Sequence, residues 1–444
     1  MVYYNRVKRF NLLLLDIAAL YGALAITLFI RYKENFAYQY ALHLLPFLFI
    51  FAIWLLVFYI VNLYDFGFLR NNLDFYSGLF QAIVFASAIS VSFFYLIPIF
   101  DITPKTNLLI FIILFSGIVI ASRTLFNQIN AGGFKKLLLI VGVNTQSLEL
   151  AKYIEENPQL GYELKYIMDL AKEEVKNIDR VIKDDRINTV VISPETYQAP
   201  QIIDTFYRSL ENRVTFKNLS SFYEQLTNKV PLGAINQVWF LENLSEGSKK
   251  TYEEIKRFLD IAFAVVMGII ISPFLPFVAL LIRLETPGPV FYLQKRFGQN
   301  GKIFEIIKFR TMTRDAEKET GAIWAQENDS RTTRLGKLLR KTRIDELPQL
   351  WNILRGEMSF VGPRAERPEF HDELKTSVPF YEERYIIKPG LTGWAQINYR
   401  YGSSVADAAE KLQYDLYYIK NRSLILDLGV VLKTINIAMR QEGR

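Results

Sequence analysis

Hydrophobic residues are concentrated in the first third of the chain, where they form long runs with short polar links. The runs cover residues 10–30, 42–63, 79–100 and 108–125, and each approaches the roughly 20 residues that a membrane-spanning helix needs. The first run lacks the small-residue cleavage site of a signal peptide. Buried core helices are the alternative, but four such runs in series favour a helical transmembrane bundle over residues 1–130.

Basic side chains flank this region on both sides: Arg6, Lys8 and Arg9 precede it, and Lys135 and Lys136 follow it. An even number of spans with positive charge at both outer ends places both ends in the cytoplasm. Two further polar residues, His43 and Arg123, lie at span edges, where we expect interfacial rather than catalytic positions.

From about residue 135 the pattern becomes that of a cytoplasmic α/β domain. Residues 135–157 read as a buried strand, a glycine turn and an amphipathic helix, and 189–193 form a second apolar strand. A G-x-G-x-x-G fingerprint that starts at Gly142 would have Asn144 and Ser147 in place of its other glycines. We therefore predict a Rossmann-like domain at 131–245 with a structural or regulatory role and no support for a bound cofactor.

A later apolar run, 258–282, is interrupted by Ser272 and Pro273. A proline-kinked spanning helix is the simplest interpretation. Basic residues on both sides favour the cytoplasm for both ends: Lys256, Arg257, Arg283, Lys295 and Arg296. A helix that breaks and returns through one leaflet satisfies this, so we expect a re-entrant membrane helix at 256–283 within a monotopic α+β domain at 250–444.

The polar motifs of this last domain surround one carboxylate pair, Asp345-Glu346. Two neighbouring acids are costly unless a cation or a proton compensates them. The alternative is a solvated pair that caps a helix beginning at Pro348. Upstream, Lys308 and Arg310 alternate with Phe309, so they are expected on one side of an extended segment, in an arrangement suited to phosphate beside a metal ion.

Three further patterns accompany the pair. A basic helix with leucines on its other face is expected to lie on anionic lipid; its charged residues are Arg331, Arg334, Lys337, Arg340, Lys341 and Arg343. A glycine-rich loop at 388–398 reads either as a plain turn or as a sugar or base site; its polar residues, with the next arginine, are Gln396, Asn398 and Arg400. Two amphipathic helices follow, with tyrosines suited to a bilayer interface: Tyr414, Tyr417 and Tyr418.

Composition narrows the chemistry. The 444 residues include no cysteine and two histidines, which excludes disulfides and thiolate metal sites and leaves little room for zinc. Hydrophobic residues make up 51% of the chain, as expected when membrane segments accompany polar ones. A net charge of +7 predicts an anionic partner: lipid headgroups, nucleic acid or phosphorylated substrates.

Four ordered motifs resemble those of the bacterial sugar transferases, which are polyprenyl-phosphate hexose-1-phosphate transferases. They are KFRTM at 308–312, IDELPQLWNILRGEMSFVGPR at 344–364, KPGLTGWAQIN at 388–398 and YDLYYIKNRSLILDL at 414–428. The resemblance covers roughly 252–444, and the upstream half is similar to the large form of these monotopic phosphoglycosyl transferases. The residues after Gly-Pro-Arg, at 365–368, are similar to those of an exopolysaccharide-type branch. Ala365 stands where many members have proline after Gly-Pro-Arg, so no role is assigned to that proline.

The resemblance implies that a UDP-sugar gives its hexose-1-phosphate to undecaprenyl phosphate, with release of UMP, to start exopolysaccharide, capsule or O-antigen synthesis. Asp345 is expected to form an aspartyl-phosphosugar intermediate, and Glu346, together with Asp345, to hold Mg²⁺. Lys308, Arg310 and Arg364 are expected to bind phosphate oxygens.

The same resemblance implies a multi-pass protein of the bacterial inner membrane, with the catalytic domain on the cytoplasmic face. Membrane lipid and phosphorylated substrates then account for the positive charge, and nucleic acid has no role. The sequence does not identify the sugar, the polysaccharide pathway or the ligand of the Rossmann-like domain, and it leaves open whether the chain forms a homodimer.

Two other classes of function compete with this one. A membrane-bound nucleotide-sugar dehydratase would need a glycine fingerprint and a Tyr-x-x-x-Lys pair; Tyr252 and Lys256 have that spacing but follow the α/β domain. Bound NAD would support it. A non-catalytic scaffold of a polysaccharide assembly complex predicts instead that Asp345→Ala leaves polymer output intact.

Overall fold

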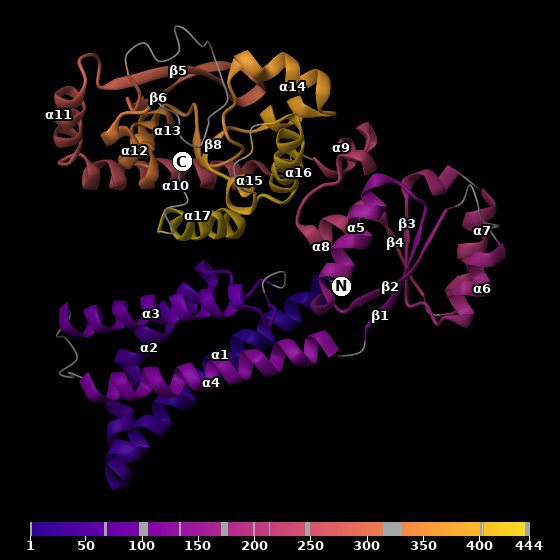
Figure 1. Cartoon of the computed structure of the whole chain (residues 1–444), viewed down its shortest axis with the longest axis horizontal. Helices are drawn as coiled ribbons and strands as arrows, with labels where there is room; N and C mark the ends of the chain where they lie inside the picture. The colour runs from indigo at the N-terminus through magenta and orange to yellow at the C-terminus, as the bar shows by residue number, and fades with distance from the viewer. Residues whose placement is uncertain are drawn as a thin grey trace. The chain divides into compact units, whose positions relative to one another are not determined.

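A computed structural model describes residues 2–65, 69–96, 105–132, 135–169, 176–198, 200–212, 214–244, 249–313, 331–399, 402 and 404–439 (Figure 1). The chain divides into two units, Met1–Phe222 and Tyr223–Arg444, and each has hydrophobic cores of its own. The first unit holds the predicted transmembrane and Rossmann-like regions, and the second holds the predicted catalytic domain.

Long apolar helices open the first unit. They are α1 (Val2–Tyr32), α2 (Phe36–Ile60), α3 (Leu73–Leu96) and α4 (Lys105–Gly132). Among the described residues, three stretches are long and apolar enough to cross a membrane, or four if the bent pair described below counts as one span. The first, Val7–Ile60, has 54 residues. At 1.5 Å per residue it reaches about 80 Å, more than twice the apolar thickness of a bilayer, so it has room for two spans.

A break between α1 and α2 separates the first two predicted spans. Lys33, in the short 3₁₀ turn Lys33–Asn35, has a φ of 39°, in the left-handed region that interrupts a helix. Helix α1 packs against both α2 and α4. The length and apolar composition of these helices indicate a membrane protein. Residues 97–100 of the third predicted run lie outside the described residues.

His43 and Arg123 are buried between helices and paired with protein groups, which corrects the prediction of exposed, interfacial side chains. Arg123 is fully buried and forms an ion pair with Asp16 at 2.5 Å, while Tyr64 donates to the same carboxylate at 2.8 Å. His43 is 2% exposed, with Nε2 3.0 Å from the Asn107 amide nitrogen. Polar side chains can be buried among apolar helices only when they are paired, and these partners come from distant parts of the sequence.

A parallel sheet follows, as predicted. Its strands are β1 (Lys136–Val141), β2 (Tyr162–Met168), β3 (Thr189–Ile192) and β4 (Thr215–Asn218), in the order β2-β1-β3-β4. The helices α5 (Thr145–Glu156) and α8 (Leu219–Thr227) lie on one side of it, and α6 (Lys176–Asp184) and α7 (Pro200–Arg208) on the other (Figure 1). The central strand β3 is buried throughout, as expected for a strand covered on both faces.

The turn after β1 differs from a dinucleotide fingerprint in the way that the sequence predicted. Gly142 has a φ of 100°, and a Cβ there would lie 2.6 Å from the Cβ of Ser193. Asn144 and Ser147 form a capping box in which each side chain accepts the other's backbone N–H. The side chains of Asn144 and Ser147 therefore cap the N-terminus of α5.

The second unit begins before the predicted domain boundary. Helix α9 (Gln237–Asn243) lies within it, and Trp239 and Val230 are buried in the same core as α16 (Val405–Asn421). Residues 223–243, expected in the Rossmann-like domain, thus belong with the C-terminal unit.

The predicted helix–break–helix is present in this unit. Helices α10 (Lys250–Ile271) and α11 (Leu275–Glu285) are bent by 63° at the break that contains Ser272 and Pro273. Apolar side chains on both helices are exposed, among them Phe258, Ile269 and Phe277. Its course into and out of one leaflet stays a prediction.

The other helices and strands of this unit position the candidate site described in the next section. They are β5 (Phe291–Phe297), β6 (Ile303–Phe309), α12 (Arg334–Lys341), the 3₁₀ helix η9 (Ile344–Gln349), α13 (Leu350–Arg355), β7 (Ser359–Val361), α14 (His371–Ser377), β8 (Gly390–Thr392), α15 (Trp394–Asn398) and α17 (Leu424–Met439). Strands β5 and β6 are antiparallel, and β7 and β8 are parallel.

Two surface predictions need correction. Leu335 and Leu339 of α12 pack against Ile282 and Phe309, so this helix uses its leucines for the protein core and leaves Leu338 exposed. Tyr418 does not face a bilayer.

Tyr418 is 1% exposed, and its hydroxyl donates to Asp427 at 2.6 Å. The exposed apolar face at this end of the chain lies on α17, where Ile425, Leu428 and Ile435 are on the surface.

Candidate active site

The carboxylate pair lies inside a helical turn. The turn begins before the pair, since Arg343 has a φ of 60° and its carbonyl oxygen accepts the Glu346 N–H at 3.2 Å. Pro348 is inside η9 and α13 begins at Leu350, so the prediction of a helix that begins at Pro348 was wrong. Asp345 and Glu346 are each 8% exposed, which excludes a solvated surface pair.

Glu346 is surrounded by cations. Its Oε1 lies 3.0 Å from Lys308 Nζ and 3.1 Å from Arg364 Nη2, and its Oε2 lies 3.5 Å from Arg343 Nη1. Burial alone would raise the pKa of Glu346, but the charges of Lys308, Arg364 and Arg343 outweigh it and hold the pKa well below its usual value. Glu346 is therefore an ionised carboxylate.

Asp345 is in the opposite situation. Burial and the neighbouring negative charge of Glu346 raise the pKa of Asp345 to about 6. Among the described residues, its buried Oδ1 has no hydrogen-bond partner. An unsatisfied buried oxygen costs free energy and commonly marks a position that a ligand, an ion or a reacting atom completes.

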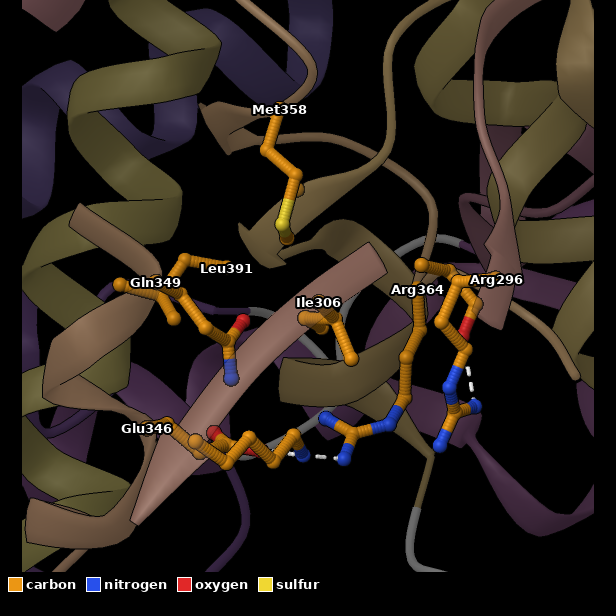
Figure 2. A pocket seen from close by; sticks show the side chains of 10 residues that line it. Arg296, Ile306, Glu346, Gln349, Met358, Arg364 and Leu391 are labelled. Atoms are coloured by element: carbon orange, nitrogen blue, oxygen red, sulfur yellow. Dashed lines mark hydrogen bonds and ion pairs between the residues drawn. The ribbon is translucent and has the colours of Figure 1, made fainter. Parts of the chain in front are cut away.

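A small pocket opens beside Glu346, and Figure 2 shows the Glu346 and Arg364 side chains pointing toward one another in it. Its lining residues are Arg296, Ile306, Lys308, Glu346, Gln349, Met358, Arg364, Ala365, Gly390 and Leu391. Asp345 is not among them. The cavity measures about 10 Å³, close to the least that one water molecule needs, so it accepts a single oxygen or ion and leaves a nucleotide outside.

The sequence places Arg296 only among the basic residues that flank the predicted re-entrant helix, and it indicates no site role for Arg296, Gln349 or Met358. A signal for Arg296 was present in the hairpin of β5 and β6, where Arg296 pairs with Phe304 and Tyr292 pairs with Lys308. Because side chains alternate along each strand, Arg296 and Lys308 share one face. Gln349 and Met358 needed the packing of η9 and β7, which no local pattern shows.

Arg310 is placed elsewhere. Strand β6 ends at Phe309, and the Arg310 guanidinium donates to the carbonyl oxygens of Thr286 at 2.7 Å and Pro287 at 3.1 Å. The structure therefore brings Lys308, Arg364 and Glu346 together, and it directs Arg310 to the segment after α11.

The loop at 388–398 is not a plain turn. It forms β8 and α15, and β8 runs so close to the end of its parallel neighbour β7 that a Cβ on Gly390 would lie 2.1 Å from the backbone nitrogen of Gly362. Only glycine permits this approach, which places Gly390 and Leu391 at the pocket.

The polar residues of this loop point to its own backbone. Gln396 donates to the Leu391 carbonyl at 3.4 Å, and Asn398 donates to that of Trp394 at 2.9 Å. Neither lines the pocket, and Arg400 lies outside the described residues.

Tyr252 and Lys256, the pair with dehydratase spacing, have a structural environment. Both donate to Asp427 Oδ2, at 2.8 and 2.7 Å, and Tyr418 donates to Oδ1 of the same residue. This network joins α10 to α16 and α17, and it accounts for the two side chains without a nucleotide.

The carboxylate pair fits Mg²⁺. No group of three or more His, Asp or Glu side chains that could hold a metal ion exists in the described part of the chain. Magnesium is commonly bound by one or two carboxylates, with water and substrate phosphates as the other ligands. The partnerless Asp345 Oδ1 and the ionised Glu346 supply that oxygen-only donor set.

Helices long and apolar enough to cross a membrane occur in the same chain as a pocket lined by Arg296, Lys308, Arg364 and the buried Glu346. Residues 251–441 match the family model described as Bacterial sugar transferase. A Klebsiella pneumoniae protein named UDP-glucose:undecaprenyl-phosphate glucose-1-phosphate transferase is 30% identical over 374 residues, 78% of each chain. The chain therefore belongs to the bacterial sugar transferase family.

Two other relatives match less than half of this chain. The Aeromonas hydrophila UDP-N-acetylgalactosamine-undecaprenyl-phosphate N-acetylgalactosaminephosphotransferase is 48% identical over 192 residues, 43% of this chain and 45% of that protein. The exopolysaccharide production protein PSS of Rhizobium leguminosarum bv. phaseoli is 40% identical over 189 residues, 41% of this chain and 93% of that protein.

Proposed function

We propose that this chain transfers a hexose-1-phosphate from a UDP-sugar to undecaprenyl phosphate and releases UMP, on the cytoplasmic face of the bacterial inner membrane. The observation that carries the proposal is the asymmetry of the carboxylate pair: three cations hold Glu346, while Asp345 Oδ1 has no partner in the described chain. The names of the Klebsiella and Aeromonas relatives support the reaction class.

The reaction proceeds in two displacements. An Asp345 carboxylate oxygen forms a bond to the phosphorus that carries the sugar, and the bond from that phosphorus to the bridging oxygen breaks, so UMP leaves with the electron pair. An oxygen of undecaprenyl phosphate then attacks the same phosphorus and releases the carboxylate. Because the transfer occurs in two steps, the UDP-sugar and undecaprenyl phosphate, which are both anionic, need not be held in contact at the same time.

Lys308 and Arg364 bind the phosphate oxygens. Both now form ion pairs with Glu346, and the arginine guanidinium can bind phosphate oxygens through two parallel N–H bonds as it binds a carboxylate. Arg296, on the same face as Lys308, adds a further positive charge to the pocket. Mg²⁺ held by Glu346 and Asp345 would supply additional charge neutralisation on the diphosphate.

The test is direct. Purified protein in detergent is incubated with undecaprenyl phosphate and, one at a time, UDP-glucose, UDP-galactose, UDP-N-acetylglucosamine and UDP-N-acetylgalactosamine, and UMP is measured. We expect UMP with at least one sugar and none from Asp345→Asn. If folded wild-type protein releases no UMP with any of these, the proposal is wrong.

A further inference from the structure

The fully buried amide of Asn352 lies outside the pocket and has no part in the reaction described above. Asn352 is on α13, six residues after Glu346. Its Oδ1 accepts the Ile307 N–H at 3.1 Å, and its Nδ2 donates to the Glu305 carbonyl oxygen at 2.7 Å. Nδ2 also donates to Glu357 Oε2 at 2.7 Å, so the amide orientation is determined by its partners.

These bonds lie along the edge of β6 that faces away from β5. The bonds at the two ends of the hairpin, Arg310 N to Val290 O at 2.9 Å and Gly298 N to Lys302 O at 2.7 Å, show that even-numbered positions bond toward β5. In an antiparallel pair the odd-numbered positions then point outward. Glu305 and Ile307 are odd-numbered, so the Asn352 amide bonds to this edge as a third strand would.

One amide thereby sets the register between two segments that carry the site. Lys308 follows Ile307 directly, and its Nζ lies 3.0 Å from Glu346 Oε1. A slip of one residue would move β6 by about 3.3 Å and turn Lys308 to the other face. We propose that Asn352 is a positioning residue that holds Lys308 in register with Glu346 and Asp345, for the reaction under Proposed function, on which this inference rests.

Helix α13 does not depend on Asn352 for its own position. From α10, the Arg257 guanidinium donates to the carbonyl oxygens of Ile353 at 2.6 Å and Leu354 at 2.8 Å, and Ile353 is fully buried in the local core. Loss of the Asn352 amide should therefore release β6 from α13 while α13 stays on α10.

A double-mutant cycle separates positioning from a structural role. Asn352→Ala should lower the rate of UMP release about tenfold to hundredfold, as for other residues that orient reactive groups. In a Lys308→Met background, however, the same change should cost far less, because the amine that Asn352 positions is gone. Losses that differ between the two backgrounds by more than about twofold mark coupling, since independent sites add to within about that factor. Ile353→Val is the matched control, and its effect should be equal in both backgrounds. Equal losses for Asn352→Ala in both backgrounds would overturn the proposal.

A second readout does not depend on the reaction. In Asn352→Ala, hydrogen exchange at the Ile307 amide should become at least about tenfold faster, because its acceptor is gone, while the Lys308 amide, which faces β5, keeps its rate. Acylation of the Lys308 amine by a small reagent should also increase. Should Ala at this position unfold the protein, Asn352→Asp keeps the size and the Ile307 bond but places a carboxylate against Glu305 O and Glu357.

The two failures are distinguishable. If wild-type protein releases no UMP but Asn352→Asp exposes Lys308 to acylation, the proposed function is wrong and the positioning role stands. If UMP is released and neither variant changes Lys308 acylation or Ile307 exchange, the positioning role is wrong.

Discussion

Two neighbouring carboxylates have opposite surroundings, and this difference determines what each can do. Glu346 is ionised, and both of its carboxylate oxygens form ion pairs with cationic side chains. By contrast, the Oδ1 of Asp345 is buried without a partner among the described residues. A pair whose pKa values are moved apart is typical of sites that divide chemical roles between similar groups. We therefore propose Asp345 as the nucleophile and Glu346 as the residue that holds the cations.

The Glu346→Gln variant tests the second assignment. It keeps the size of the side chain but removes the charge that pairs with Lys308 and Arg364 and that would hold Mg²⁺. We expect UMP release to fall about a hundredfold, with a remainder that rises as Mg²⁺ is increased, since substrate phosphates still bind the ion. Asp345→Asn is the control and should show no response to Mg²⁺. An unchanged rate in Glu346→Gln would contradict the assignment.

Among the elements, the parallel strands β7 and β8 approach one another at a contact that admits only glycine. A Cβ on Gly390 would lie 2.1 Å from Gly362 N and 2.3 Å from Thr392 O, both backbone atoms that cannot rotate away. This close contact keeps Arg364 beside the pocket, because Arg364 forms a β-bridge with Gly390.

Gly390→Ala should therefore destabilise the protein by about 3 kcal/mol or more, the upper range for overpacking, and lower UMP release because Arg364 moves. Thermal unfolding in detergent measures the first effect. Gly268→Ala, where a Cβ would meet nothing within 4 Å, is the matched control and should leave the melting temperature unchanged or higher. Equal melting temperatures for Gly390→Ala and wild type would show that the backbone around Gly390 is not packed this tightly.

The bent helix pair carries a topological prediction. Both of its ends are flanked by basic residues, and α10 and α11 change direction by 63°. In this cysteine-free chain, single cysteines at Glu254 and Gln294 should both resist a periplasmic thiol reagent. A spanning segment would instead leave Gln294→Cys labelled and Glu254→Cys protected.

In the whole molecule, the catalytic unit begins earlier than the family match does. The match starts at residue 251, yet Val230 and Trp239 are buried in the core that contains Leu412 and Leu416. Ion pairs from the same segment reinforce it, with Glu224 2.7 Å from Lys420 and Lys229 2.5 Å from Glu410.

A truncated chain of residues 223–444 should therefore fold in membranes and release UMP, because it keeps this segment and loses only the first unit. A chain of residues 250–444 lacks Val230 and Trp239 and should melt at a lower temperature, since burying each large apolar side chain contributes about 1.5–3 kcal/mol. Equal stability of the two chains would contradict the boundary at 222/223. If a folded 223–444 chain has no activity, the Rossmann-like domain takes part in catalysis.

Local patterns predicted much of this architecture, and their failures have a physical cause. The apolar runs, the parallel strands and the Ser272–Pro273 break were foreseen because each is visible within one segment. The inward rotation of Tyr418 depends on Asp427, and the burial of Arg123 depends on Asp16, so neither could be inferred without tertiary contacts.

The same distinction between local patterns and tertiary contacts applies to the candidate site. Asp345, Glu346, Lys308 and Arg364 belong to contiguous motifs and were predicted, whereas Arg296 required the register of the β5–β6 hairpin. Asn352 belongs to the same motif as the acids, but its role depends on the free edge of β6, which only the paired strands define.

The central claim is that Asp345 forms a covalent bond to the substrate phosphorus. Purified protein is mixed with a UDP-sugar labelled in the sugar, without undecaprenyl phosphate, then quenched in acid and digested. The account predicts UMP release of at most one equivalent and label on the peptide that contains Asp345, with no label in Asp345→Asn. Label on Glu346, or UMP release that requires the lipid acceptor, would contradict it.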